Sequence, residues 1–408
     1  MKRIILILLF ISFFSAVLRP SGDSPLTCFR ILQPFCLWII YKVNRNYFAY
    51  LIKISLLFLV LGLVQNILTR YSFYPNIKTF SFTFFFLYYL NYFTIFVVAT
   101  LVYSLWFLDK QLFFENIIQF ASRTVKFCIF LFVFYVLLGG DNRNFLYIGG
   151  NINNFGCLLV AGLIAIIFDN STKTIFKYIY IVLILIILLY NDSKLALIGA
   201  VLVVDLYTIA YISTEVSKNV RNILLIIMVI ISLFGAYSYF TSSSDINGYE
   251  VQGLIVIPFE YIKNGEYFDE STSSIAFRTN SIVGIINILK TSYGIGVGPG
   301  NTSFILTTLM PDREGRFFEL DYTSPHIWWL ELICDLGWFI IIPTLKLFYK
   351  QIRDYCLLKS NNELLFSQIF FISFPLWCAS ASSLYTEYYC IMMITISFII
   401  YKFKYVRS

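Results

Sequence analysis

The residues best suited to chemistry lie around His326, the only histidine in the chain. His326 belongs to the stretch TSPHIWWLEL, residues 323–332, where a polar segment passes into a long apolar run. At the start of a helix, an imidazole faces the positive end of the backbone dipoles, which keeps it neutral and able to accept a proton. His326 is therefore a candidate general base, with a purely structural histidine as the alternative.

Two carboxylates follow His326 in the same apolar run. Glu331 and Asp335 are four residues apart, so a helix places them on one face. Carboxylates inside a membrane helix are costly unless they are paired or functional. We therefore expect Glu331 and Asp335 to contribute to substrate binding, and we expect Trp328 and Trp329 to anchor the helix at the membrane interface.

Three basic residues lie nearest the membrane boundaries that we predict to face the outside: Arg143, Lys194 and Arg278. Cations in such positions can neutralise a pyrophosphate group, which a membrane enzyme meets on a lipid carrier. The alternative is that each is a surface charge whose stem lies along the membrane.

Glycines at positions 294, 296, 298 and 300 form the stretch YGIGVGPGN. The Lys and Ser/Thr of a Walker loop are missing, and GxGxxG would need glycine at 299 or 301, which are Pro and Asn. We expect a flexible turn after a helix. The functional alternative is that backbone amides, including that of Gly298, approach a phosphate.

The composition shows what must position these residues. Hydrophobic residues make up 59% of the chain and charged residues 13%, and the mean hydropathy is +0.77, which indicates an all-α integral membrane protein. Hydropathy predicts about twelve transmembrane helices, near residues 4–18, 26–41, 47–68, 79–108, 126–139, 152–168, 174–190, 195–212, 222–240, 326–349, 364–383 and 387–402.

The chain is thereby divided into residues 1–240 with nine helices, a large external loop at 241–325, and residues 326–408 with three helices. Within the loop, apolar residues at 275, 282, 285, 286 and 289 predict an amphipathic helix lying on the membrane surface. Most basic residues fall at ends that would be cytoplasmic, so the positive-inside rule places both termini in the cytoplasm. The net charge of +7 then reflects topology and needs no nucleic acid.

Four stretches in order along the chain resemble the O-antigen polymerase and O-antigen ligase superfamily of bacterial polysaccharide assembly. The sequence GNINNFGCLL, residues 150–159, is similar to the G-N-P-N-N-F-G stretch of that family and carries Asn153 and Asn154. NDSKLALIGA, residues 191–200, is similar to its S-R-x-x-L segment, with Lys194 in place of Arg.

The other two stretches flank the polar end of the external loop. Residues 276–304 resemble the family segment in which an Arg precedes a helix and a G-x-G-x-G turn, and Arg278 takes the Arg position. HIWWLELICDLG, residues 326–337, is similar to H-N-x-Y-L-x-x-L-x-E-x-G, with Ile327 for Asn and Asp335 for Glu.

The resemblance implies a GT-C-like, metal-independent glycosyltransferase in the bacterial inner membrane, with its active site facing the periplasm. Its donor would be an oligosaccharide on undecaprenyl pyrophosphate, and no cofactor is required. Arg278 and Lys194 would stabilise the leaving pyrophosphate, and His326 would accept the proton of the attacking sugar hydroxyl, inverting the anomeric carbon.

We favour a polymerase over a ligase that transfers glycan to the lipid A core, because the chain departs from the usual motifs. A flippase or transporter would place functional charges near the bilayer midplane and show an internal repeat, and neither is visible. Membrane lipids are expected partners, and a chain-length regulator is a candidate partner.

Overall fold

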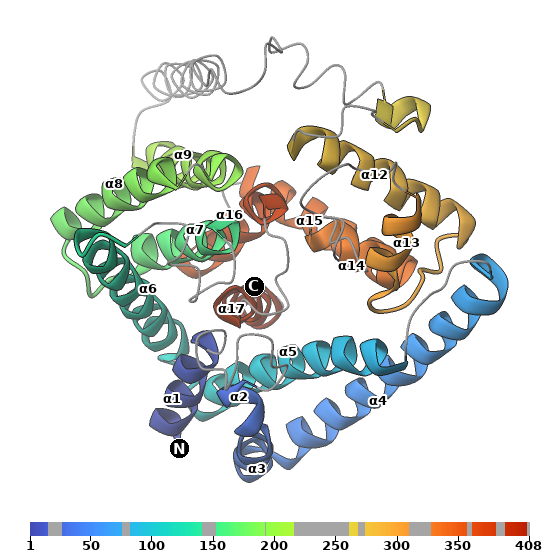
Figure 1. Ribbon diagram of the computed structural model, residues 1–408. Coiled ribbons are helices and arrows are strands. Elements are labelled where there is room, and N and C mark those ends of the chain that lie inside the picture. The colour runs from blue at the N-terminus through green and yellow to red at the C-terminus, as the bar shows by residue number, and fades with distance from the viewer. Residues whose placement is uncertain are drawn as a thin grey trace. The chain divides into compact units, whose positions relative to one another are not determined.

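The structure is a computed structural model that describes residues 1–14, 27–75, 82–140, 152–191, 193–215, 261–267, 274–309, 328–356, 361–380 and 388–405. Every regular element assigned in these residues is a helix (Figure 1), which confirms the predicted all-helical class. Within them, the helices long and apolar enough to cross a membrane are Arg45–Phe73, Phe85–Leu108, Phe113–Leu137 and Leu195–Ile212. The chain is thus compatible with a multi-pass membrane protein.

The elements follow one another along the chain with short connections. Their bounds are α1 (Lys2–Phe13), α2 (Cys28–Ile31), α3 (Gln33–Val43), α4 (Arg45–Leu68), the π-helix η1 (Thr69–Phe73), α5 (Phe82–Leu108), α6 (Phe113–Leu137), α7 (Ile152–Phe168), α8 (Thr174–Tyr190), α9 (Lys194–Glu215), α12 (Ser274–Thr291), α13 (Asn301–Leu309), α14 (Trp328–Leu336), α15 (Trp338–Cys356), α16 (Asn362–Trp377), the 3-10 helix η3 (Cys378–Ser380) and α17 (Tyr388–Tyr405).

The chain forms two compact units. Unit 1 comprises Met1–Leu59, Phe86–Val203 and Leu347–Ser408, and unit 2 comprises Val60–Phe85 and Val204–Lys346. Helix α14, which begins the third predicted part of the chain, packs against α12 and α13 in unit 2.

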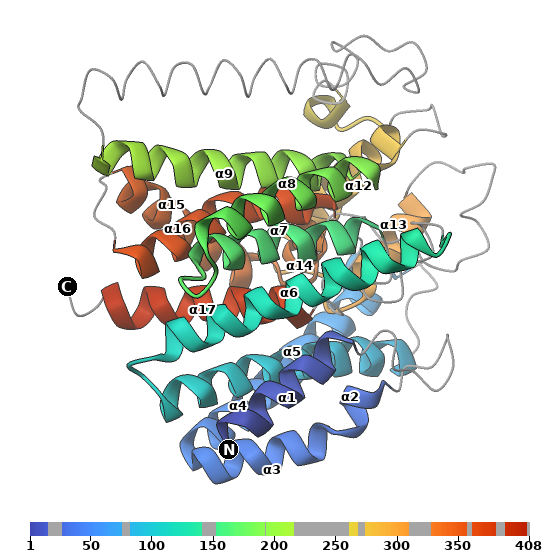
Figure 2. The same ribbon diagram turned by 90° about the vertical axis from the view of Figure 1, so that its left-hand side faces the viewer.

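Helix α7 is the centre of unit 1, where it packs against α6, α8, α16 and α17 (Figure 2). Its sequence, INNFGCLLVAGLIAIIF, contains no charged residue, and it is buried from Asn154 to Phe168. Gly162 lets α6 approach closely, because a Cβ atom there would lie 2.3 Å from Cγ2 of Val125. A wholly apolar helix with a small residue at the contact is suited to this central position.

Two predicted membrane segments have different limits in the structure. The segment predicted at 126–139 belongs to the longer helix α6, which starts at Phe113 and buries Phe114, Ile117 and Ile118 along one face. Amphipathic residues do not raise a hydropathy average, so this first half was missed. The segment predicted at 326–349 is divided at Gly337, whose φ of 61° ends α14 before α15 begins.

Basic residues gather at one end of unit 1. Lys2 Nζ lies 2.6 Å from Asp109 Oδ2, and Lys110 lies over the Trp106 ring at 5.1 Å. The Trp106 ring stacks on Phe403 with centroids 3.9 Å apart. The start of α1 and the ends of α5 and α17 therefore lie together, as the predicted cytoplasmic orientation of these ends requires.

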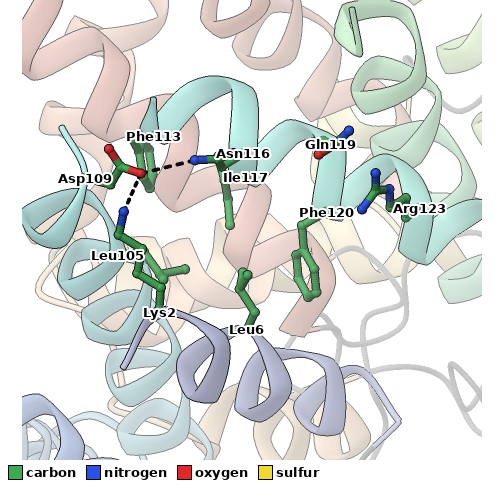
Figure 3. Close-up of a pocket in the computed structure, with 10 residues that line it drawn as sticks. All are labelled: Lys2, Leu6, Leu105, Asp109, Phe113, Asn116, Ile117, Gln119, Phe120 and Arg123. Carbon is green, nitrogen blue, oxygen red and sulfur yellow. Dashed lines mark hydrogen bonds and ion pairs between the residues drawn. The ribbon is translucent and has the colours of Figure 1, made fainter. Parts of the chain in front are cut away.

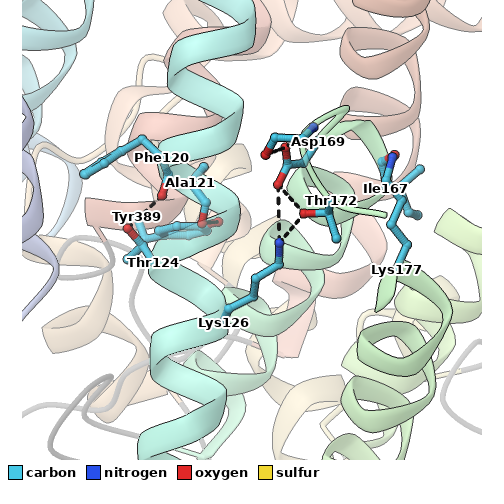
Figure 4. A network of polar contacts seen from close by, with 10 residues as sticks. Phe120, Ala121, Thr124, Lys126, Ile167, Asp169, Thr172, Lys177 and Tyr389 are labelled. Atoms are coloured by element: carbon cyan, nitrogen blue, oxygen red, sulfur yellow. Dashed lines mark hydrogen bonds and ion pairs between the residues drawn. The ribbon is translucent and has the colours of Figure 1, made fainter. Parts of the chain in front are cut away.

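A polar network joins α6 to the turn between α7 and α8 (Figure 4). The Asp169 carboxylate, 2% exposed, accepts hydrogen bonds from the Ser171 backbone N–H at 2.9 Å and the Thr172 hydroxyl at 2.6 Å. Lys126 Nζ of α6 lies 3.3 Å from Asp169 Oδ2. Burial alone would raise the pKa of Asp169, but the hydroxyl and backbone donors outweigh it and hold this pKa well below its usual range.

Candidate functional site

The glycine-rich stretch forms a turn that pairs with the end of α14 in unit 2. In this glycine turn, residues 292–300, the N–H of Val297 donates to the Cys334 carbonyl at 3.1 Å, and that of Gly298 donates to the Asp335 carbonyl at 3.0 Å. The N–H of Trp338 donates back to Gly294 O at 2.9 Å. Two predicted site segments, the glycine stretch and the segment after His326, are thus joined through their backbones.

The regular spacing of the glycines has a conformational cause. Gly294, Gly296, Gly298 and Gly300 have φ values of 71°, 90°, 89° and 87°, a region that side chains with a Cβ atom disfavour. At Gly296 a Cβ atom would also lie 2.6 Å from Asp335 O. The turn predicted for this stretch is present, and the Gly298 amide, which donates to Asp335 O, is not available to a phosphate.

Asp335 anchors the start of α13 with its side chain. Its Oδ2 accepts from the Gly300 N–H at 3.1 Å, and its Oδ1 accepts from the Thr302 hydroxyl at 2.5 Å. The residue is 0% exposed. A carboxylate at this place satisfies unpaired donors of the first helical turn and complements the positive end of the helix dipole.

Glu331 lies one turn earlier on α14 and is 2% exposed. Its Oε1 accepts from the Ser303 hydroxyl at 3.3 Å. The two carboxylates therefore share one face of α14, as their spacing predicts, and that face contacts the first turn of α13. The contacts of Asp335 support a positioning role in place of the direct substrate contact expected from the sequence.

The end of α4 supports the glycine turn from a third side. Gln65 Nε2 donates to Ile295 O at 2.8 Å, and Thr69 Oγ1 donates to Val297 O at 2.8 Å. Asn301 Nδ2 donates to Asn66 Oδ1 at 2.7 Å. Sequence analysis missed these supporting residues, although three polar residues near the end of a long apolar helix are a usable signal.

The helix predicted inside the external loop is present as α12, but its packing differs from the prediction. Ile285 and Ile288 join Val297, Ile305, Leu306 and Cys334 in a buried apolar cluster. Polar residues at the start of the helix, Thr279, Asn280 and Ser281, are buried as well. The helix therefore packs on α13 and α14, and its buried positions do not follow the single apolar face expected for a surface helix.

A second cluster forms in unit 1, where the start of α7 meets the start of α9. Ser193 Oγ lies 3.5 Å from Asn153 Oδ1. A Cβ atom at Gly156 would lie 2.6 Å from Ser193 Oγ, so glycine is needed for this close approach. Asn154 is buried beside it in the same helical turn. The predicted segments 150–159 and 191–200 are therefore in direct contact.

Asn191 adds a feature that the sequence did not single out. It follows the last residue of α8 and is 3% exposed, and neither its Nδ2 nor its Oδ1 has a hydrogen-bond partner among the described residues. An amide buried in this way costs free energy, so it calls for a functional or structural explanation. Its position three residues before Lys194 makes it a candidate ligand contact.

The remaining predicted site residues divide into two groups. Arg143 and His326 lie outside the described residues. Arg278 belongs to α12 and Lys194 is the first residue of α9, but their side chains lie outside the described part. The structure thus places the backbone of both proposed cations at the start of a helix next to one of the two clusters.

Comparison of the chain with protein-family models, with curated proteins and with solved structures gave no match.

Proposed function

We propose that the protein is a polysaccharide polymerase of the inner membrane that transfers glycan from an undecaprenyl-pyrophosphate-linked donor to the terminal sugar hydroxyl of a lipid-linked acceptor. The observation that carries this proposal is the pairing of the four motif-like segments. Segment 150–159 contacts segment 191–200 in unit 1, and the glycine turn pairs with α14 in unit 2. Segments far apart in sequence that share contacts are expected of residues that support common sites.

The chemistry assigned to the side chains is an inverting displacement. The leaving pyrophosphate carries its negative charge without needing a proton, so Arg278 and Lys194 stabilise that charge. His326 accepts the proton from the attacking hydroxyl. Arg143, Asn153 and Asn154 are assigned to binding of the donor.

The packing around Asp335 supports this assignment because it gives α12 a fixed frame. Asp335 holds the start of α13 through Gly300 and Thr302, and α12 packs on both α13 and α14. A site that must orient a diphosphate gains from such rigid support. Asp335 and Glu331 then act as positioning residues.

The membrane arrangement of the proposal is the one derived from the sequence. It has about twelve transmembrane helices, a GT-C-like fold, cytoplasmic termini and an active site facing the periplasm. The four long apolar helices and the shorter apolar ones are compatible with that arrangement.

The test is a gel of surface polysaccharide from cells in which the gene is deleted. Core lipid bearing a single repeat is the expected result, because repeats are then made and transferred but not joined. Bare core would indicate a ligase instead, and unchanged glycan would reject both activities.

Substitutions then test the residue roles in the deletion strain. Arg278→Ala and His326→Ala, at wild-type protein level, should each reproduce the deletion, whereas Lys290→Ala should restore full-length glycan. Lys290 is the matched control because it is an exposed cation in the last turn of the same helix, α12. Normal glycan from Arg278→Ala or His326→Ala would reject the role of that residue.

A further inference from the structure

A pocket of about 280 Å³ lies within unit 1, between α1 and the first half of α6 (Figure 3). Its apolar wall is formed mainly by Leu6 of α1 and by Ile117 and Phe120 of α6. Figure 3 shows Asp109 at one end of the pocket and Arg123 at the other. The proposed glycosyl transfer uses none of these residues.

The polar end at Asp109 is internally neutral. Asp109 Oδ2 accepts from Lys2 Nζ at 2.6 Å and from Asn116 Nδ2 at 3.2 Å. The hydrogen bond from Lys2 holds the pKa of Asp109 below its usual value, so the two groups remain an ion pair at neutral pH. This end offers polar contacts but no net charge.

The other end carries an uncompensated positive charge. Arg123 and Gln119 line the pocket, and neither has a hydrogen bond or ion pair with another described residue. The side chains lining the pocket therefore sum to one positive charge, from Arg123. A guanidinium is well suited to gripping a phosphate oxygen pair.

The location and size of the pocket narrow the class of ligand. At about 30 Å³ for each water molecule, the volume corresponds to about nine waters. That suits a phosphoglycerol group and excludes a nucleotide or an oligosaccharide. The pocket also lies at the end of unit 1 where Lys110 covers Trp106, the combination of basic and aromatic residues that marks a membrane interface.

We propose that this pocket binds a phosphate ester with one net negative charge, with Arg123 on the phosphate, Asn116 and Gln119 on the headgroup hydroxyls, and the apolar wall against the adjoining carbon chain. The expected source is the headgroup of an anionic phospholipid such as phosphatidylglycerol in the cytoplasmic leaflet. A free glycerol phosphate offers the same chemistry and is distinguished by the experiment.

The experiment follows thermal unfolding of the purified full-length protein in neutral detergent while lipid is added. Phosphatidylglycerol should raise the unfolding temperature saturably, and phosphatidylcholine and phosphatidylethanolamine should not. If free glycerol phosphate matches phosphatidylglycerol, the source is the soluble ester; if it has no effect, the source is the lipid. Equal shifts with all three phospholipids would overturn the proposal.

Variants locate the effect. Arg123→Gln should weaken the apparent affinity for phosphatidylglycerol at least fivefold, because it removes the charge-assisted contact, and Arg123→Lys should retain part of it. Lys173→Gln is the matched control, since Lys173 is an exposed basic residue outside the pocket. Leu6→Trp should fill the pocket and also weaken binding. Wild-type affinity in Arg123→Gln would overturn the proposal.

Discussion

The hydroxyl of Thr302 donates to the carboxylate of Asp335 at 2.5 Å in the interior of unit 2. This contact joins the first turn of α13 to the last turn of α14, 33 residues along the chain. The same carboxylate also receives the Gly300 N–H. Asp335 thus connects the glycine turn, α13 and α14 at a single side chain.

Thr302→Val tests this connection. It leaves a buried carboxylate oxygen without its hydroxyl donor, which should lower the free energy of unfolding by about 1–3 kcal/mol. Thr308→Val is the control on the same helix: Thr308 is exposed, so its replacement should change stability by less than about 0.5 kcal/mol. Thermal unfolding in detergent measures both, and equal effects would contradict the assigned role of Asp335.

Gly296→Ala tests why glycine is needed in the turn. It combines a φ of 90° with a Cβ atom 2.6 Å from Asp335 O, so we expect a cost of about 1–2 kcal/mol for the conformation and a further 1–3 kcal/mol, roughly, for the overlap. At Gly265, φ is 73° and a Cβ atom would meet nothing within 4 Å. Gly265→Ala should therefore show the conformational cost alone, and comparable losses of folded protein in both variants would refute the packing argument.

Asn191→Leu separates a functional amide from a structural one. Removing an amide that has no partner among the described residues should leave the unfolding temperature unchanged or raise it, because a buried unpaired polar group costs about 1–3 kcal/mol. If Asn191 contacts the donor, glycan made by the variant should fall at least about tenfold. Asn170→Leu, at an exposed position before the other end of α8, should retain normal glycan. A stable Asn191→Leu protein with normal glycan would remove Asn191 from the site.

The Asp169 network predicts a pH-dependent stability. The pKa of Asp169 is depressed in the folded protein, so its stabilisation is complete above the unfolded value of about 3.9 and declines as the pH falls below it. Asp169→Asn should lower the unfolding free energy by about 2 kcal/mol at pH 7, and the difference from wild type should shrink below about pH 4.

Glu115→Gln provides the control for that titration. Glu115 is exposed in the first turn of α6, so its replacement should change stability by no more than about 0.5 kcal/mol. A constant difference between wild type and Asp169→Asn from pH 7 to pH 3 would show that the Asp169 charge does not contribute.

Several features could be predicted from the sequence because they depend on local properties. The helical class and the positions of α5, α7 and α8 follow from apolar runs, since a chain inside a bilayer must satisfy its backbone hydrogen bonds within each helix. The common face of Glu331 and Asp335 followed from helical spacing. The turn at residues 292–300 followed from its glycines.

The sequence by itself therefore determined that this is a helical chain rich enough in apolar residues for a membrane, and which segments carry polar groups in pairs. Only the tertiary structure decided what those groups contact: that Asp335 holds Gly300 and Thr302, that Gln65 and Thr69 of α4 support the glycine turn, and that Asn191 is buried without a partner in the described chain. The physical reason is that periodicity fixes the face on which a side chain lies, whereas its hydrogen-bond partner comes from a distant segment brought close by packing.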